Sequence, residues 1–265
     1  MLEIFQFDFM IRAFIAGSAI AIIAPLVGIF LVVRRYALIA DTLAHVTLLG
    51  VVVGFISGLP PLMTALGTSL VAVFGIERLR TVQRLPSDSL LSLFLSGSLA
   101  IATVLISIHH GFNLNLFSFL FGSITTVSHG DIVTILLLAV FVIGAIGTFY
   151  KELFFVSFNE DLAEASGIRT KSFGVLLLVL AVCTVVVSLK IVGALLIGAL
   201  MIIPVLTAIG YGRGFLTTAL LAVSFSLASV IGGIFLSYYW GLSSGGTIVC
   251  LALAIFIISI FINNK

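Results

Sequence analysis

Residues 13–33 read AFIAGSAIAIIAPLVGIFLVV and are followed at once by Arg34 and Arg35. No charged residue interrupts this stretch. About 20 consecutive apolar residues are enough for an α-helix to cross the hydrocarbon core of a bilayer. The stretch therefore predicts a retained transmembrane helix with a positively charged end.

The composition of the whole chain extends this prediction. Of the 265 residues, 62% are hydrophobic and only 8% are charged, with a mean hydropathy of +1.39. Soluble domains carry about 25% charged residues, so this chain cannot cover itself with a hydrated surface. Alternating ten-residue segments, which are typical of a membrane β-barrel, are absent. The fold class that we expect is an all-α polytopic membrane protein.

Long apolar runs recur along the chain and are separated by polar breaks. We expect the chain to form a single transmembrane domain over residues 1–265, with eight or nine transmembrane helices. The count falls from nine to eight if the first run or one of the short segments 172–189 and 191–209 does not cross fully. The nine expected segments are 13–33, 37–57, 60–76, 89–108, 131–150, 172–189, 191–209, 215–236 and 245–262.

The positive charges fall in alternate breaks between the expected segments. Cytoplasmic loops of membrane proteins carry an excess of Lys and Arg, so these breaks are predicted to be cytoplasmic. With nine segments, the N-terminus lies outside and the C-terminus inside. Ten of the twelve Lys and Arg residues lie in these breaks, namely Arg34, Arg35, Arg78, Arg80, Arg84, Lys151, Arg169, Lys171, Arg213 and Lys265.

Asp41 and His45 lie inside the second expected segment. An ionisable residue inside a span costs about 2.5–3.5 kcal/mol on insertion scales and is a functional candidate by default. Four residues apart on a helix, the two side chains share one face and can converge on a single ion. His45 lies about 15 Å from the charged end of the segment, because a helix rises 1.5 Å per residue. Three interpretations stay open, namely a structural bond between the two side chains, a proton relay and a path for a metal ion.

The break after the fifth segment predicts a short helix at about 157–168. Ser157 or Asn159 can cap its start, Glu160 and Asp161 favour its first turn, and Gly167 is a natural stop. The segment is either an ordinary loop helix or a docking site for a soluble partner.

Motifs for chemistry on this chain are missing. We find no phosphate-binding loop of the form GxxxxGK[ST], no HExxH and no GxSxG. The chain is therefore predicted not to be an enzyme, and no basic cluster is large enough for nucleic acid. The roles of four further residues stay open, namely His109, His110, His129 and Lys190.

The stretch Ala40-Asp41-Thr42-Leu43-Ala44-His45 resembles the G-D-[TA]-L-[AS]-H pattern of the permease subunits of bacterial ABC importers for zinc and manganese. The D-T-L-A-H form, followed by Leu48-Leu49-Gly50, looks more like the zinc members, although Ala40 departs from the usual glycine. Three other stretches resemble the same family in their order and spacing. They are Leu116 to Gly122, Asp161-Leu162-Ala163 with Gly167, and Val192 to Pro204.

This resemblance implies a fold like that of the cobalamin and siderophore importer permeases, in a bacterial inner membrane. It implies a homodimer of two permease copies in membrane lipid, a cytoplasmic ATP-binding subunit and an extracytoplasmic metal-binding protein. No cofactor is held permanently, and the metal ion is cargo. Asp41 and His45 would line the metal path. The residues that would couple the chain to the ATPase are Asn159, Glu160, Asp161, Ala163 and Gly167.

Zinc is the expected cargo, and manganese or iron imported by the same mechanism is an alternative. A second alternative is a secondary transporter driven by an ion gradient, with Asp41 and His45 as its proton relay. That transporter would work without an ATPase partner. A third reading, a membrane scaffold, leaves Asp41 and His45 without a role.

Overall fold

The computed structural model describes residues 6–83, 85–109, 120–122, 127–189, 191–194 and 196–263. These residues are almost entirely α-helical, because backbone amides in hydrocarbon must be paired within their own segment. In chain order the helices are α1 (Asp8–Val33), α2 (Leu38–Ser57), α3 (Pro61–Gln83), α4 (Ser87–Ile108), α6 (His129–Thr148), α7 (Tyr150–Phe158), α8 (Glu160–Ala165), α9 (Thr170–Ser188), α10 (Ile197–Ile209), α11 (Phe215–Trp240) and α12 (Ser244–Asn263).

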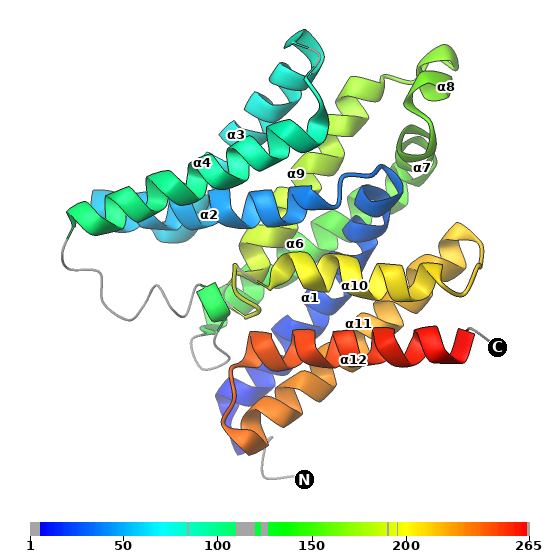
Figure 1. Cartoon of the computed structure of the whole chain (residues 1–265). Helices are drawn as coiled ribbons and strands as arrows, with labels where there is room; N and C mark the ends of the chain where they lie inside the picture. The colour runs from blue at the N-terminus through cyan, green and yellow to red at the C-terminus, as the bar shows by residue number, and fades with distance from the viewer. Residues whose placement is uncertain are drawn as a thin grey trace.

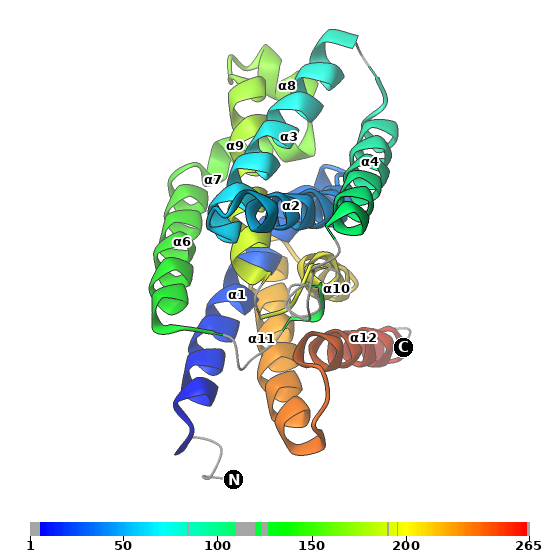
Figure 2. The same cartoon turned by 90° about the vertical axis from the view of Figure 1, so that its left-hand side faces the viewer.

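The helices pack around a buried centre (Figures 1 and 2). Helix α1 contacts α6, α9, α10 and α11 and is the most deeply buried of the long helices. Helix α2 packs between α3 and α4 on one side and meets α9 and α10 on the other. The least buried long helices are α4, α6 and α12. An apolar face on an outer helix of a membrane protein can meet lipid or another subunit.

Eight of the described helices are long and apolar enough to cross a membrane. The seventh expected segment is wrong in its extent, because 191–209 is helical only from Ile197. Helix α10 has 13 residues. It therefore rises only about 20 Å, against a hydrocarbon core of about 30 Å. The described residues of the break before it, 189, 191–194 and 196, are not α-helical.

The short helix still carries the chain back across the protein. The ring of Phe215 at the start of α11 packs at a tilt against that of Phe30 near the end of α1, with 5.1 Å between ring centroids. The ring centroid of Tyr238, near the end of α11, lies 6.3 Å from that of Phe7. The amide of Asn263 donates to the Gly210 carbonyl, which joins the ends of α12 and α10. The described chain therefore begins and ends at opposite ends of α11.

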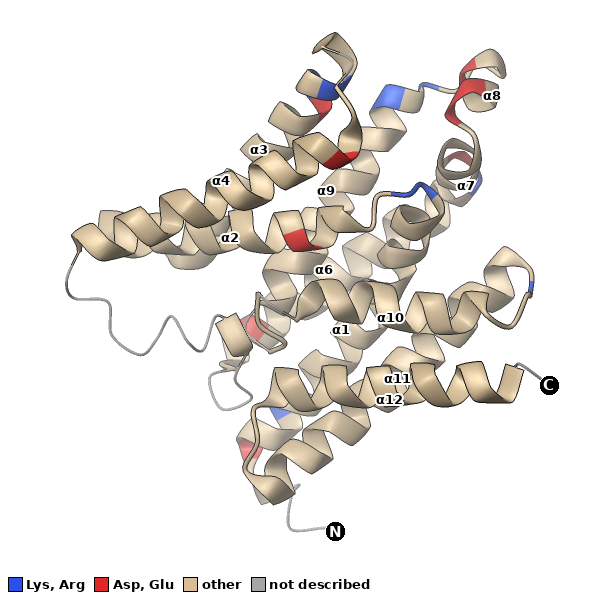
Figure 3. Ribbon diagram, in the orientation of Figure 1, with Lys and Arg blue, Asp and Glu red and all other residues tan. Residues whose placement is uncertain are grey.

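Most Lys and Arg residues gather on the face where α1 and α3 end and α9 begins, as Figure 3 shows. We call this the charged face, and its excess of positive charge is typical of a cytoplasmic face. One expectation for this face is wrong. The third expected segment, 60–76, ends too early, because α3 continues to Gln83. Arg78 and Arg80 thus lie in the last turns of α3 and not in a loop.

Helices α2 and α3 are in close contact through glycine. A Cβ atom built on Gly50 would lie 2.6 Å from the Cα of Ala65 and 2.9 Å from the carbonyl oxygen of Thr64. Both of these are backbone atoms, so a side chain at residue 50 would push α3 away from α2. By contrast, a Cβ atom on Gly67 of α3 would meet nothing within 4 Å.

We therefore expect Gly50→Ala to destabilise the protein by about 1–3 kcal/mol, the usual cost of overpacking. The matched variant Gly67→Ala should be neutral or stabilising by up to about 1 kcal/mol, because alanine is the better helix former. Thermal unfolding of the purified protein in detergent checks both. Equal melting temperatures for the two variants would contradict the close contact of α2 with α3.

Candidate functional site: a carboxylate and an imidazole beside a broken helix

Helix α2 places Asp41 and His45 on one of its faces. The helix starts at Leu38, three residues after Arg35, and both side chains lie in its first half. They are four residues apart, so they are separated by about 6 Å along the helix axis. Ile39, Ala40 and Leu43 on the other faces are fully buried.

The face that carries the two side chains is not fully covered. Leu38, Asp41, His45 and Leu49 form a partly exposed stripe with helical spacing, which we call the open stripe. Leu38 is 44% exposed, and the other three are partly buried. Because the other described residues in the first half of α2 are buried, the open stripe leaves room for a further group against Asp41 and His45.

Asp41 faces the start of α10. A Cβ atom built on Gly198 would overlap Oδ1 of Asp41 and lie 2.9 Å from its Cγ. The carboxylate thus occupies the space that any other residue at 198 would fill. The N-terminus of a helix favours negative charge, and Gly198 is the second residue of α10. The break before α10 therefore brings a helix end to Asp41, an arrangement that transporters use at their binding sites.

The two side chains do not pair with each other. No hydrogen bond joins Asp41 to His45 in the described residues, and the buried Nδ1 of His45 has no hydrogen-bond partner. A neutral imidazole nitrogen and a carboxylate are ligands for zinc and related ions. The described residues contain no group of three or more His, Cys, Asp or Glu that could hold a metal. One chain therefore offers a carboxylate and an imidazole here, fewer than the three or four ligands of a typical zinc site.

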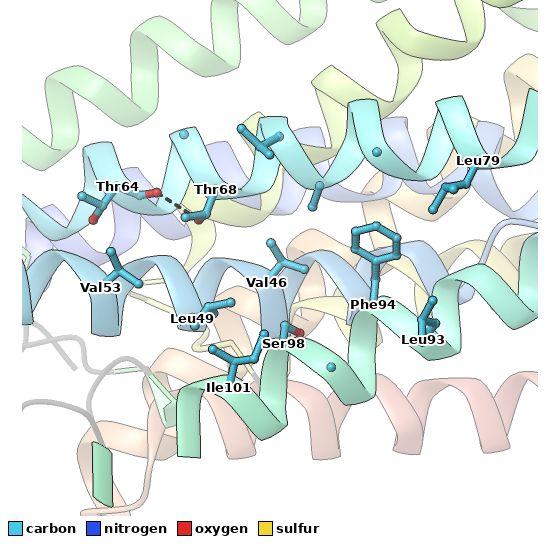
Figure 4. A pocket seen from close by; sticks show the side chains of 15 residues that line it. Val46, Leu49, Val53, Thr64, Thr68, Leu79, Leu93, Phe94, Ser98 and Ile101 are labelled. Atoms are coloured by element: carbon cyan, nitrogen blue, oxygen red, sulfur yellow. Dashed lines mark hydrogen bonds between the residues drawn. The ribbon is translucent and has the colours of Figure 1, made fainter. Parts of the chain in front are cut away.

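A cavity lies nearby on α2 but offers no side chains that could bind a metal ion. It is an apolar groove of about 890 Å³ between α3 and α4, floored by α2 (Figure 4). Its only polar groups are the hydroxyls of Thr64, Thr68 and Ser98, and each donates to a carbonyl of its own helix. The groove thus has no charged or unpaired group for an ion.

The segment predicted at 157–168 is divided between two helices. Residues up to Phe158 belong to α7, and α8 spans Glu160–Ala165. Asn159 caps α8, accepting a 3.0 Å bond from the Leu162 amide, and Gly167 ends the turn at φ +82°. These two residues shape the segment.

The side chains of this segment point in different directions. Ala163 is fully buried, so it faces the protein interior. Asp161 is exposed. Phe158 and Leu162 are 65% and 56% exposed, and neither was among the expected coupling residues. Their exposure could not be read from the sequence, because the chain turns between α7 and α8.

Glu160 turns toward the protein and binds two arginines. Arg80 donates from Nη1 to Oε2 and from Nη2 to Oε1, both at 3.1 Å. Nη2 of Arg34 lies 3.2 Å from Oε1. Burial by itself would raise the pKa of Glu160, but the hydrogen bonds and charges of Arg80 and Arg34 bring that pKa below its usual value. Sequence analysis placed these arginines at the same face but did not identify the cluster.

The other candidate residues lie apart from this site. Nε2 of His129, at the start of α6, lies 3.2 Å from Nη1 of Arg12. His109 follows the end of α4, and its Nδ1 lies 3.3 Å from the carbonyl of Leu105. His110, Lys190 and most of the stretch from Leu116 to Gly122 lie outside the described residues.

Comparison with known proteins assigns this architecture. The model of the "ABC 3 transport family" matches residues 6–263. A Treponema pallidum protein named "Probable metal transport system membrane protein" is 38% identical over 242 residues, 91% of this chain and 90% of that protein. The Haemophilus influenzae "High-affinity zinc uptake system membrane protein ZnuB" is 28% identical over 97% of this chain and 98% of its own length. The Streptococcus gordonii "Manganese import system permease protein ScaB" is 30% identical over 98% and 93%.

Two solved structures share the fold. The permease in "PsaBC from Streptococcus pneumoniae in complex with Fab" superposes with a TM-score of 0.87 at 31% identity, over 98% of this chain and 93% of that one. A metal-chelate type ABC transporter in an inward-facing conformation superposes with a TM-score of 0.72 at 13% identity, over 95% and 85%. The second likeness concerns the fold alone.

The ion pairs of Glu160 predict a pH dependence of stability. Because the pKa of Glu160 is lowered in the folded state, its contribution to stability is present above the ordinary glutamate pKa of 4.5 and is lost as the pH falls through the folded-state pKa. We expect Glu160→Gln to lower stability at pH 7 by about 1–2 kcal/mol. The difference from wild type should shrink as the pH falls below 4.5. Melting curves from pH 3.5 to 7.5 measure it.

The neighbouring variant Asp161→Asn is the control. Asp161 is exposed and makes no ion pair within the described residues, so its loss should not change the melting temperature at any pH. A Glu160→Gln difference that grew toward low pH would contradict the ion pairs.

Proposed function

Because this chain belongs to the ABC 3 transport family and is the membrane permease of an ABC importer for a divalent metal, we propose that its cargo is zinc and that the ion passes Asp41 and His45. ATP is hydrolysed on a separate subunit of such an importer. A gradient-driven transporter, the alternative considered from the sequence, is set aside by the family.

One observation carries the proposed path. The open stripe presents Asp41 and His45 toward uncovered space, beside the helix start at Gly198, and the Nδ1 of His45 is unpartnered. A buried polar nitrogen without a partner is costly unless something binds it. A passing cation would satisfy the imidazole and the carboxylate together, and partial ligation suits an ion that must also leave.

A second copy of the chain would complete the ligand set. Two open stripes facing each other would supply two carboxylates and two imidazoles, the four ligands that zinc accepts in a tetrahedral site. The low burial of α4 and α12 leaves long apolar faces available for such a pairing. We therefore propose a homodimer with the metal path between its two copies.

The choice of zinc rests on the donor set. Sites with nitrogen and oxygen ligands bind zinc more tightly than manganese or iron in the general order of divalent ions. The D-T-L-A-H form of residues 41–45 also favours the zinc members of the family. The manganese named for the relative from Streptococcus gordonii is the alternative cargo.

For docking, we propose that the ATP-binding subunit contacts the exposed side of α7 and α8. Phe158, Asp161 and Leu162 form that exposed side. Asn159 and Gly167 act by shaping the turn that presents it. The metal-binding protein that delivers the ion would dock on the opposite face, where α6 and α12 begin.

The test is zinc uptake into vesicles that contain the whole importer, permease with ATPase and delivery protein. Asp41→Asn and His45→Gln keep the side-chain shapes and remove a ligand, so we expect uptake to fall about tenfold or more. Asp88→Asn, an exposed carboxylate on α4, is the control and should transport normally. Unchanged uptake in both site variants would exclude the path.

The same vesicles identify the cargo. Unlabelled zinc should suppress the uptake of labelled zinc at lower concentration than manganese or iron does. Stronger competition by manganese would show that manganese, and not zinc, is the cargo. It would not contradict the path past Asp41 and His45.

Gly198→Ala tests the position of the carboxylate. The new Cβ would displace the free end of the Asp41 side chain and not backbone, so the protein should fold while the carboxylate rotates away. We expect uptake about tenfold lower with little change in melting temperature. The control Gly144→Ala lies on α6, where a Cβ would meet nothing within 4 Å. Normal uptake by Gly198→Ala would show that the carboxylate position observed here does not matter.

A further inference from the structure

The helix that carries Asp41 and His45 is bound firmly to two neighbours. The hydroxyl of Thr42 donates to the Leu91 carbonyl of α4 at 3.2 Å. The hydroxyls of Thr47 and Ser69 are 2.9 Å apart and join α2 to α3. With the close contact at Gly50, these bonds make α2, α3 and α4 a unit, which we call the three-helix unit.

Glu160 connects α8 to this unit. Its carboxylate binds Arg80 on α3 through two hydrogen bonds of 3.1 Å. Arg80 is held in turn by Glu77, at 2.8 Å from Nη2 and 3.2 Å from Nε. We find no other hydrogen bond or ion pair between α8 and the three-helix unit among the described residues. Two-pronged pairs of this kind fix geometry as well as charge.

Arg34 forms the second connection, to the turn between α1 and α2. Its side chain is 7% exposed, and it lies 3.2 Å from Glu160 and 5.3 Å from the centre of the Tyr36 ring. The hydroxyl of Tyr36 lies 3.0 Å from that of Ser87 at the start of α4. Arg35, between Arg34 and Tyr36 in the sequence, has φ +61°, a backbone conformation that is uncommon outside glycine. The turn is thus held in one shape from both sides.

Both connections end close to the metal path. The turn leads directly into α2, and Asp41 is the sixth residue after Arg35. A displacement of α8 would therefore reach Asp41 through the turn and through α3 together. Since α8 has six residues and lies between α7 and α9, it has little packing of its own to resist such a displacement.

We propose that Glu160, bound by Arg34 and Arg80, is a latch that makes α8 and the three-helix unit move as one body, so that the ATPase subunit moves Asp41 and His45 through it. Arg34 and Arg80 are positioning residues, which act on the path through other groups. The inference rests on the proposed function. It also changes the role expected for Glu160, from contact with the ATPase to contact within the permease.

The first experiment measures zinc transported per ATP hydrolysed by the whole importer in vesicles. Glu160→Gln and Arg80→Gln break the latch from its two sides, and each should lower this ratio about fivefold or more while hydrolysis continues. The control is Arg78→Gln, an exposed arginine two residues earlier on α3, without an ion pair in the described region. Arg80→Lys, which keeps the charge and loses the two-pronged bond, should give an intermediate ratio and serves if Arg80→Gln does not fold.

The outcomes separate the two proposals. If Glu160→Gln lowered the zinc transported per ATP and Arg80→Gln did not, Glu160 would be an ATPase contact and the latch would be overturned. A normal ratio in both variants would also overturn the latch. Wild-type vesicles without zinc uptake would instead refute the proposed cargo.

The second experiment measures movement directly. Spin labels at Glu164→Cys on α8 and Val82→Cys on α3 report the distance between the two bodies, in a protein whose free Cys183 and Cys250 are replaced. The distance should be the same in the nucleotide-free and ATP-bound importer. In Glu160→Gln it should differ between the two states. The latch would be overturned if the distance changed on ATP binding by the same amount in the importer with Glu160 and in the Glu160→Gln variant.

Discussion

Inside a hydrocarbon layer each backbone amide must find a hydrogen-bond partner within the protein, and the architecture follows from this constraint. It makes the chain helical almost throughout the described residues. It also makes the break before α10 informative. Residues 191–194, which are not helical, are buried, and the chain then enters α10, where Gly198 meets Asp41. The interruption thus brings a helix end to a carboxylate.

The ionisable groups of the protein form two sets that differ in whether they are paired. In the first half of α2, Asp41 and His45 stay partly uncovered and unpaired with each other. At the charged face, Glu160 forms ion pairs with Arg34 and Arg80, and all three side chains are buried or partly buried. Unpaired groups remain available to a passing ion, whereas paired groups hold elements together. The first arrangement suits binding and release, and the second suits the transmission of movement.

Much of this could be predicted from the sequence, because hydrophobic runs and the placement of arginines depend on local composition. The eight long helices, the charged face and the pair Asp41 and His45 all come from such local patterns. The shortness of α10 could not be predicted from the sequence, because the apolar run continues through the break that precedes the helix. The contact of Gly198 with Asp41 and the Glu160 cluster join residues more than 75 positions apart, and no periodic signal reports such a contact.

The cluster at Glu160 also bears on how the chain is made. Membrane proteins are synthesised from the N-terminus, so Arg34 and Arg80 are made long before Glu160. During that interval both arginines lack this carboxylate partner and can anchor the ends of α1 and α3 on the cytoplasmic side, which sets their orientation. Only when α8 emerges does the carboxylate join them. The same two cations thus serve first as topology signals during insertion and then as a permanent joint of the assembled protein.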